Sequence, residues 1–250
     1  TRFKCDWSSD VCSSDLLAVA PEVPANANVL LIATPQVDLQ PAEVQKIKQF
    51  IGKGGNLLWL IDQEPLRGLQ PVAEQLGLVL GPGTVVDPDA ARLNASPAVA
   101  IGAGYGRHAI TDNFTLNTVF PFARQVGANE GRDWRVTRLI DVAPRGWVEM
   151  GKLDDKIAFD KGRDIAGPVT IALALERAVN DRPQRVVVVG NGSFLANQFL
   201  GNGGNLRVAY AGPGGARFEL REAFRRRRVA RRSARRFTDR KSTRLNSSHT

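Results

Sequence analysis

The sequence is poor in the side chains that carry most redox and nucleophilic chemistry. Its 250 residues include only 2 cysteines and 2 histidines. Cys5 and Cys12 lie near the amino end and His249 near the carboxyl end, so His108 is the one histidine of an interior without a thiol. For this interior, the composition excludes disulfide scaffolds, cysteine-ligated metal sites and thiolate catalysis.

The chain also has no long apolar run. Its apolar runs, such as Val29 to Ala33, fall far short of the roughly 18 residues that a membrane-spanning helix needs. The sequence therefore predicts no membrane span within these residues, and any anchor would have to come from segments outside them.

The two ends differ in character from the interior. Read back into codons, Cys5 to Leu16 and Asp239 to His249 resemble the two strands of a common sequencing adapter. We therefore interpret residues 1–16 and 239–250 as adapter-derived artefacts, which have no place in an argument about the fold.

The positive charge is also concentrated outside the interior. The formal net charge is +9, yet residues 17–216 carry 19 basic and 19 acidic side chains, whereas residues 217–238 contain ten arginines. Such a tail is typical of nucleic-acid or anionic-membrane binding, but it has no helical apolar stripe and continues into the adapter-like segment. We expect residues 207–238 to be a frameshifted reading of GC-rich DNA and expect no nucleic-acid partner; a genuine basic tail is the alternative.

The first half of the interior alternates apolar runs with helical patterns. Residues 29–34 and 57–61 are continuous apolar runs, as expected of strands that are buried on both faces. Apolar residues recur with helical spacing over 41–51 and 69–76, and Pro41 suits the first position of a helix. This order predicts a parallel sheet with right-handed crossovers.

The second half is less regular. Apolar and polar residues alternate over 134–140 and 169–176, which predicts half-exposed strands. Residues 185–189 form a further buried strand, and Gly190 to Ser193 form a tight turn that leads into a short helix over 194–200.

Several segments resemble, in their order and spacing, the GldG-type auxiliary components of ABC transporters, a family first associated with gliding motility. They are Val37 to Glu43, Gly54 to Asp62, His108 to Thr111, Val186 to Leu195 and Gly201 to Leu206. The resemblance implies one α/β domain over residues 17–206, with a flavodoxin-like or class I glutamine-amidotransferase-like fold: a mostly parallel sheet with helices on both faces.

The resemblance also implies a cellular setting. The full-length protein would be membrane-anchored, this domain would be periplasmic or extracytoplasmic, and its partners would be the permease and ATPase subunits of a bacterial transporter. Family members usually carry an acidic residue where Asn191 or Ser193 stands, so this chain departs from the family at that polar position.

The residues give little support to catalysis. A glutamine-amidotransferase-like hydrolase needs a cysteine that the interior lacks, and Ser193 is not flanked by the glycines of a nucleophile elbow. His108 lies far upstream and is expected to form local hydrogen bonds. We predict no catalytic residue, and an enzyme of unrecognised type is the last-ranked alternative.

Cofactor and metal sites are equally poorly supported. The Gly190-Asn191-Gly192 turn lacks the third glycine of a dinucleotide-binding loop. Basic residues interleave with Asp154, Asp155, Asp160 and Asp164, and the glycine and final glutamate of a calcium-binding loop are missing. We expect neither a cofactor nor a metal.

One polar cluster is predicted from the strand ends. Asp62 follows one buried strand, and Asn191 and Ser193 follow another. In open α/β sheets the carboxyl ends of the strands form the usual binding crevice, so these residues are expected to contact a partner subunit or, alternatively, a small ligand. The competing interpretation is that Asp62 caps the following segment and Asn191 only tolerates a left-handed turn.

Overall fold

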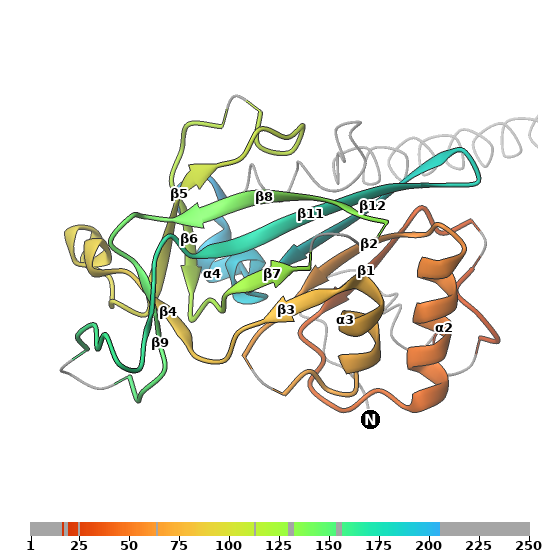
Figure 1. Ribbon diagram of the computed structural model, residues 1–250, viewed down its shortest axis with the longest axis horizontal. Coiled ribbons are helices and arrows are strands. Elements are labelled where there is room, and N and C mark those ends of the chain that lie inside the picture. Colours follow the sequence, from red (N-terminus) through yellow and green to blue (C-terminus); the bar gives the residue numbers. More distant parts are fainter. Residues whose placement is uncertain are drawn as a thin grey trace, which may run out of the picture.

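The structure is a computed structural model that describes residues 17, 20–24, 26–63, 65–112, 114–129, 133–153 and 157–205 (Figure 1). The adapter-like segments 1–16 and 239–250 and the arginine-rich segment 207–238 lie outside the described residues. Their interpretation therefore stays a prediction from sequence.

A curled seven-stranded mixed sheet forms the centre of the molecule. In spatial order, the first three strands are parallel to one another, whereas all the remaining pairs of neighbouring strands are antiparallel. In spatial order the strands are β1 (Val29–Ala33), β2 (Asn56–Leu60), β12 (Arg182–Val189), β11 (Thr170–Val179), β8 (Arg135–Val142), β5 (Val99–Tyr105) and β6 (Thr118–Pro121).

Two small antiparallel sheets and a few short helices complete the described fold. One small sheet pairs β3 (Leu78–Leu80) with β7 (Val126–Ala128). In the other, β9 (Trp147–Glu149) is the central strand and pairs with β10 (Ile165–Ala166) and β4 (Thr84–Val86). The helices are α2 (Pro41–Gly52), α3 (Gln70–Leu76), α4 (Asn197–Leu200) and the 3-10 helices η1 (Pro88–Leu93) and η2 (Ser193–Leu195). No helix in the described part of the chain is both long and apolar enough to cross a bilayer.

The predicted strands and helices of the first half are confirmed. The prediction that residues 29–34 are buried on both faces is wrong, because β1 is an edge strand and its Leu31 is 57% exposed. Helix α2 begins at Pro41, where the backbone N–H of Gln40 donates to the carboxylate of Glu43 at 2.8 Å. Helix α3 ends at Gly77, whose left-handed φ of 68° is accessible to glycine at little cost. The resulting β1–α2–β2 unit contains the parallel crossover that the sequence predicted.

The predicted flavodoxin-like or glutamine-amidotransferase-like fold is nevertheless wrong. The described structure is mostly β, and only three of its seven central strands are parallel. The main cause is the β11–β12 hairpin, in which Asn180 and Asp181 form a two-residue turn with φ values of 50° and 58°. Both residue types tolerate such a turn, so β11 returns directly as β12 instead of entering a crossover helix.

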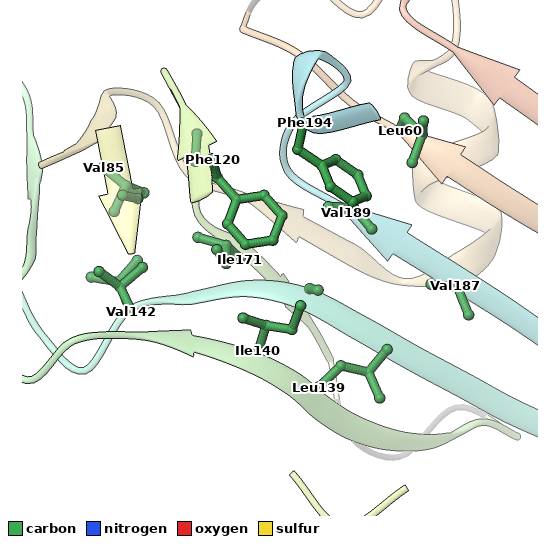
Figure 2. Close-up of a cluster of buried hydrophobic side chains, with 14 of the residues drawn as sticks. Leu60, Val85, Phe120, Leu139, Ile140, Val142, Ile171, Val187, Val189 and Phe194 are labelled. Carbon is green, nitrogen blue, oxygen red and sulfur yellow. The ribbon is translucent and has the colours of Figure 1, made fainter. Parts of the chain in front are cut away.

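The core consists of two apolar clusters that lie on opposite faces of the parallel strands. Ile47, Ile51, Val72 and Leu76 of α2 and α3 pack in one cluster with alternate residues of β2 and β12. The other cluster joins β2 and β12 to β5, β6, β8 and η2 (Figure 2), and within it the rings of Phe120 and Phe194 lie 5.0 Å apart. The packing of Phe194 fixes the turn that follows β12.

Candidate functional site

The carboxyl ends of the three parallel strands meet at one edge of the sheet. The backbone N–H of Thr34, just after β1, donates to Leu60 at 3.3 Å, and that of Ile61, just after β2, donates to Val189 at 2.8 Å. The three chain segments that leave these strands therefore begin at the same level, as the strand register requires.

The turn after β12 lies directly against the ends of the other two strands. The backbone N–H of Gly192 donates to Asp62 Oδ1 at 2.6 Å. A Cβ atom at position 192 would lie 1.9 Å from Thr34 Oγ1, so the close approach requires glycine. Asp62 thus ties β2 to the β12 turn.

A pocket of about 320 Å³ lies at this edge, and the structure brings all three predicted residues, Asp62, Asn191 and Ser193, into its wall. Asp62 and Ser193 are half-buried. Asn191 is only 1% exposed: its side-chain NH₂ donates to Pro121 O at 2.6 Å, and its Oδ1 accepts from the N–H of Phe194 at 2.7 Å. The amide of Asn191 is therefore engaged within the fold, although Asn191 is not among the residues with positive φ and so does not occupy the left-handed turn that the competing interpretation assumed.

Three further residues of the pocket wall have backbone conformations that are unusual for their types. Thr34, Arg67 and Phe122 have φ values of 41°, 52° and 54°. The other non-glycine residues with positive φ in the described part of the chain are asparagine or aspartate, which tolerate that region. Strained positions of this kind cluster at functional sites, so the strain at this edge favours a functional role for the pocket.

Phe122 places an apolar ring at the pocket entrance. Its N–H donates to Ala98 O at 2.8 Å, and its carbonyl accepts from Gln63 Nε2 at 3.2 Å. The residue is 56% exposed although its backbone is held in place by these hydrogen bonds. Sequence reasoning missed both Phe122 and Arg67, because nothing in the local pattern marks their φ values or their proximity to Asp62.

A buried cation stabilises the backbone at this edge of the sheet, where the three parallel strands end. Arg124 is 1% exposed and donates to the carbonyl oxygens of Asp62 at 3.3 Å and Gly81 at 3.1 Å. These two bonds connect the end of β2 to the segment that precedes β4. They help to fix the backbone that carries the Asp62 carboxylate.

His108 lies in a different environment. Its Nδ1 accepts from the N–H of Ile110 at 3.1 Å, the local hydrogen bond that the sequence predicted, and its Nε2 is 3.7 Å from Glu176 Oε1. Glu176 also pairs with Arg135 and with Arg185. Burial acts to raise the pKa of Glu176, but these basic neighbours outweigh it and hold the pKa below its usual range. Among the described residues, no hydrogen bond or ion pair joins His108 to Ser193.

The acidic loop has structural partners where it is described. Asp164 accepts from the backbone N–H groups of Met150 at 3.1 Å and Asp160 at 2.7 Å, and it pairs with Arg163 at 3.3 Å. Asp154 and Asp155 lie outside the described residues. Among the residues that the structure describes, no group of three or more histidine, cysteine, aspartate or glutamate side chains could hold a metal ion.

A second pocket, of about 610 Å³, lies at the opposite edge, near the amino ends of the parallel strands. Its wall includes Lys46, Lys53 and Arg182. Lys53 pairs with Glu22 at 2.6 Å, and Lys46 Nζ donates to the carbonyl of Leu17 at 2.7 Å. Two of the three cations are therefore already engaged with the chain itself.

Comparisons with known proteins bear on family and fold. A family model described as "ABC-type uncharacterized transport system" matches residues 15–213. The chain is similar to a solved structure titled "mmIFT52 N-terminal domain", with a TM-score of 0.53 and 14% identity, over 80% of this chain and 78% of that chain. At this identity the likeness concerns the fold alone. None of the curated proteins compared with the chain matches it.

Proposed function

The chain belongs to the ABC-transporter auxiliary family described as "ABC-type uncharacterized transport system", and from this premise we propose that it is a non-catalytic, extracytoplasmic interaction domain of a bacterial ABC transport complex. Membership supports an auxiliary role in transport. The finer GldG-type assignment is part of the proposal and is supported by the spaced motifs of the sequence, such as Gly54 to Asp62 and Gly201 to Leu206.

The proposed partners are the permease and ATPase subunits of the transporter. The full-length protein is anchored to the membrane by segments outside this chain, and the domain contacts the permease, which in turn carries the ATPase. This arrangement follows from the family resemblance, and it requires a surface on the domain that can bind a protein loop.

The observation that carries the proposal is the rim at the carboxyl ends of β1, β2 and β12. Asp62 and Ser193 supply polar groups there, and Phe122 supplies an exposed ring whose backbone is fixed. An aromatic side chain on a rigid backbone loses little conformational entropy on binding, and such residues are enriched among interface hot spots. The rim therefore combines an apolar anchor with adjacent hydrogen-bonding groups.

The polar chemistry of the described residues supports a non-catalytic role. Ser193 has no hydrogen bond to a histidine or carboxylate within that part of the chain, and His108 is held by Ile110 and Glu176. Nucleophilic catalysis by serine needs an adjacent general base. No observation favours the hydrolase alternative.

Affinity purification of the tagged full-length protein from its native membranes tests the proposal. We expect an ABC permease and an ATPase to co-purify at near-stoichiometric yield, and we expect a membrane protein of unrelated function to remain absent. Recovery of the protein without any transporter subunit, from membranes in which both subunits are present, would contradict the proposal.

A second candidate function is small-ligand binding in the same crevice. It is favoured by the volume of the pocket, about 320 Å³, which lies within the range of small-molecule sites. The pocket also lies at the carboxyl ends of the three parallel strands, the end at which parallel sheets usually bind ligands.

A further inference from the structure

We propose that the 320 Å³ pocket binds a small zwitterion, an α-amino acid or a dipeptide, whose ammonium group lies at Asp62 and whose carboxylate lies at Arg67. Both residues belong to the pocket wall. The inference rests on the second candidate function, ligand binding in this crevice, and it does not depend on the association with transporter subunits.

Asp62 supplies a carboxylate that is only partly engaged. Oδ1 accepts from the N–H of Gly192 at 2.6 Å, and Oδ2 accepts no hydrogen bond from any residue that the structure describes. The backbone beneath it is fixed through Arg124. An ammonium group is a strong complement for this oxygen, because a hydrogen bond between two charged groups is stronger than one between neutral groups.

Arg67 supplies the opposite charge. Its guanidinium lies 3.7 Å from the carboxylate of Asp38, whose side chain is 71% exposed. An ion pair this loose and this solvated contributes little free energy, so a ligand carboxylate can displace it. The backbone of Arg67 is held by a 3.0 Å hydrogen bond from the N–H of Leu39 to its carbonyl, at a φ of 52°, and this fixed backbone orients the side chain at the wall.

The remaining residues of the pocket wall can contact the side chain and backbone of such a ligand. Pro65, Leu66 and Phe122 offer apolar surface for an aliphatic or aromatic side chain. Gln36 is held by donation to the Thr34 carbonyl at 3.0 Å and places a second amide at the wall. A purely cationic ligand would make no use of Arg67, and a purely anionic one would make no use of Asp62 Oδ2, whereas a zwitterion engages both side chains.

Titration calorimetry on the full-length protein tests this inference, with L-leucine, L-glutamine, L-lysine and glycyl-L-leucine as probes. We expect at least one of them to bind with 1:1 stoichiometry. For the probe that binds best, its N-acetyl derivative and its carboxamide should each bind at least about tenfold more weakly, a loss of about 1.4 kcal/mol each.

Charge-neutralising variants locate the binding. Asp62→Asn and Arg67→Gln should each weaken binding of the best probe by about tenfold or more, while the control Lys53→Gln, at the opposite pocket, leaves it unchanged. Thermal melts of the unliganded variants establish that they are folded; if Asp62→Asn is not, Arg67→Gln alone decides.

Several outcomes would overturn the inference. They are the absence of binding by all four probes at millimolar concentration, equal binding of the blocked derivatives, and binding that is insensitive to both pocket variants. Each of these outcomes leaves co-purification with the transporter unaffected, so the failure of this inference is distinguishable from the failure of the proposed interaction role.

Discussion

At the scale of single residues, the pocket wall contains two kinds of side chain. Some form hydrogen bonds that stabilise the fold, and others are available to bind a partner or ligand. Asn191 is buried and both ends of its amide are bonded within the chain, whereas Ser193, two positions later, is half-buried and has no side-chain hydrogen bond among the described contacts. Both residues were predicted to belong to one site. In the structure Asn191 stabilises the fold, whereas the side chain of Ser193 is available for binding.

Alanine substitution should separate these two residues. Asn191→Ala removes an acceptor and a donor that serve buried backbone groups, so we expect the free energy of unfolding to fall by about 2–3 kcal/mol. Ser193→Ala should change it by less than about 0.5 kcal/mol. Urea denaturation of both variants measures the difference, and equal stabilities would contradict the structural role of Asn191.

The next prediction is that His108 and Ser193 carry out no catalysis. Alanine at His108 should leave complex formation with the transporter nearly intact, because His108 lies outside the pocket wall, and alanine at either His108 or Ser193 should abolish no hydrolytic activity, because no hydrogen bond joins the two residues in the described structure. Purification of the complex with the His108 variant tests the first expectation, and a screen for ester and amide hydrolysis by the wild type and both variants tests the second. A hydrolytic activity that either substitution abolishes would contradict the non-catalytic account.

Glu176 makes stability depend on pH. Its folded-state pKa lies below its usual value because its basic neighbours, Arg135 foremost, outweigh the opposing effect of burial. A depressed carboxyl pKa stabilises the fold above the unfolded-state pKa, and that contribution is lost as pH falls through the folded-state pKa. Glu176→Gln should therefore melt below the wild type at pH 7, with a gap that narrows in acid. A gap that is constant from pH 7 to acid would contradict this.

At the scale of elements, the sequence was most informative where short-range rules decide the outcome. The parallel β1–α2–β2 unit was predictable because Pro41, the apolar stripe of α2 and the glycines after it act within one helix. The position of the rim was predictable for a related reason: residues that follow buried parallel strands must meet at one edge.

The rest of the sheet was not predictable in this way. The alternation over residues 169–176 was correctly interpreted as a strand but wrongly as a half-exposed one, because Thr170 to Leu175 are buried. The pairing of β11 with β12 and β8 depends on the Asn180-Asp181 turn and on contacts distant in sequence. The family analogy then favoured crossover helices in place of hairpins. The strained residues Thr34, Arg67 and Phe122 leave no local signal at all, because tertiary packing sets their φ values.

The hairpin turn offers a test at this scale. Asp181 has a φ of 58°, which glycine adopts more readily. Asp181→Gly should therefore change the free energy of unfolding little, because the easier turn is offset by the greater freedom of the unfolded chain, and Asp181→Val should lower it, since a β-branched residue is poorly tolerated there. Thermal melts of the two variants provide the comparison. A glycine variant no more stable than the valine variant would contradict the assigned turn.

Asn205 anchors the last described segment to the sheet. It is fully buried: its Oδ1 accepts from the N–H of Val119 at 2.8 Å, and its NH₂ donates to the carbonyls of Val119, Phe194 and Phe199. Asn205→Ala should lower the free energy of unfolding by about 2–3 kcal/mol, while the exposed Asn202→Ala should have little effect. Equal denaturation midpoints would contradict this anchoring role.

At the scale of the whole molecule, the described domain presents two pockets at opposite edges of the parallel strands. The pocket at the carboxyl ends has the strained backbone, the partly engaged carboxylate and the exposed ring. The one at the amino ends has cations that are largely engaged by the chain itself. This asymmetry makes the amino-end pocket a natural control for every experiment on the rim.

The most direct test of the central claim, that the rim at the strand carboxyl ends contacts the transporter, is the affinity of the full-length protein for its purified permease–ATPase complex in nanodiscs. Asp62→Ala combined with Phe122→Ala should weaken that affinity by about tenfold or more. The matched double variant Glu22→Ala with Lys53→Ala, at the opposite edge, should leave it unchanged, with both variants confirmed as folded by thermal melts. Equal affinity of the two folded variants, or a loss confined to the Glu22/Lys53 variant, would contradict the account.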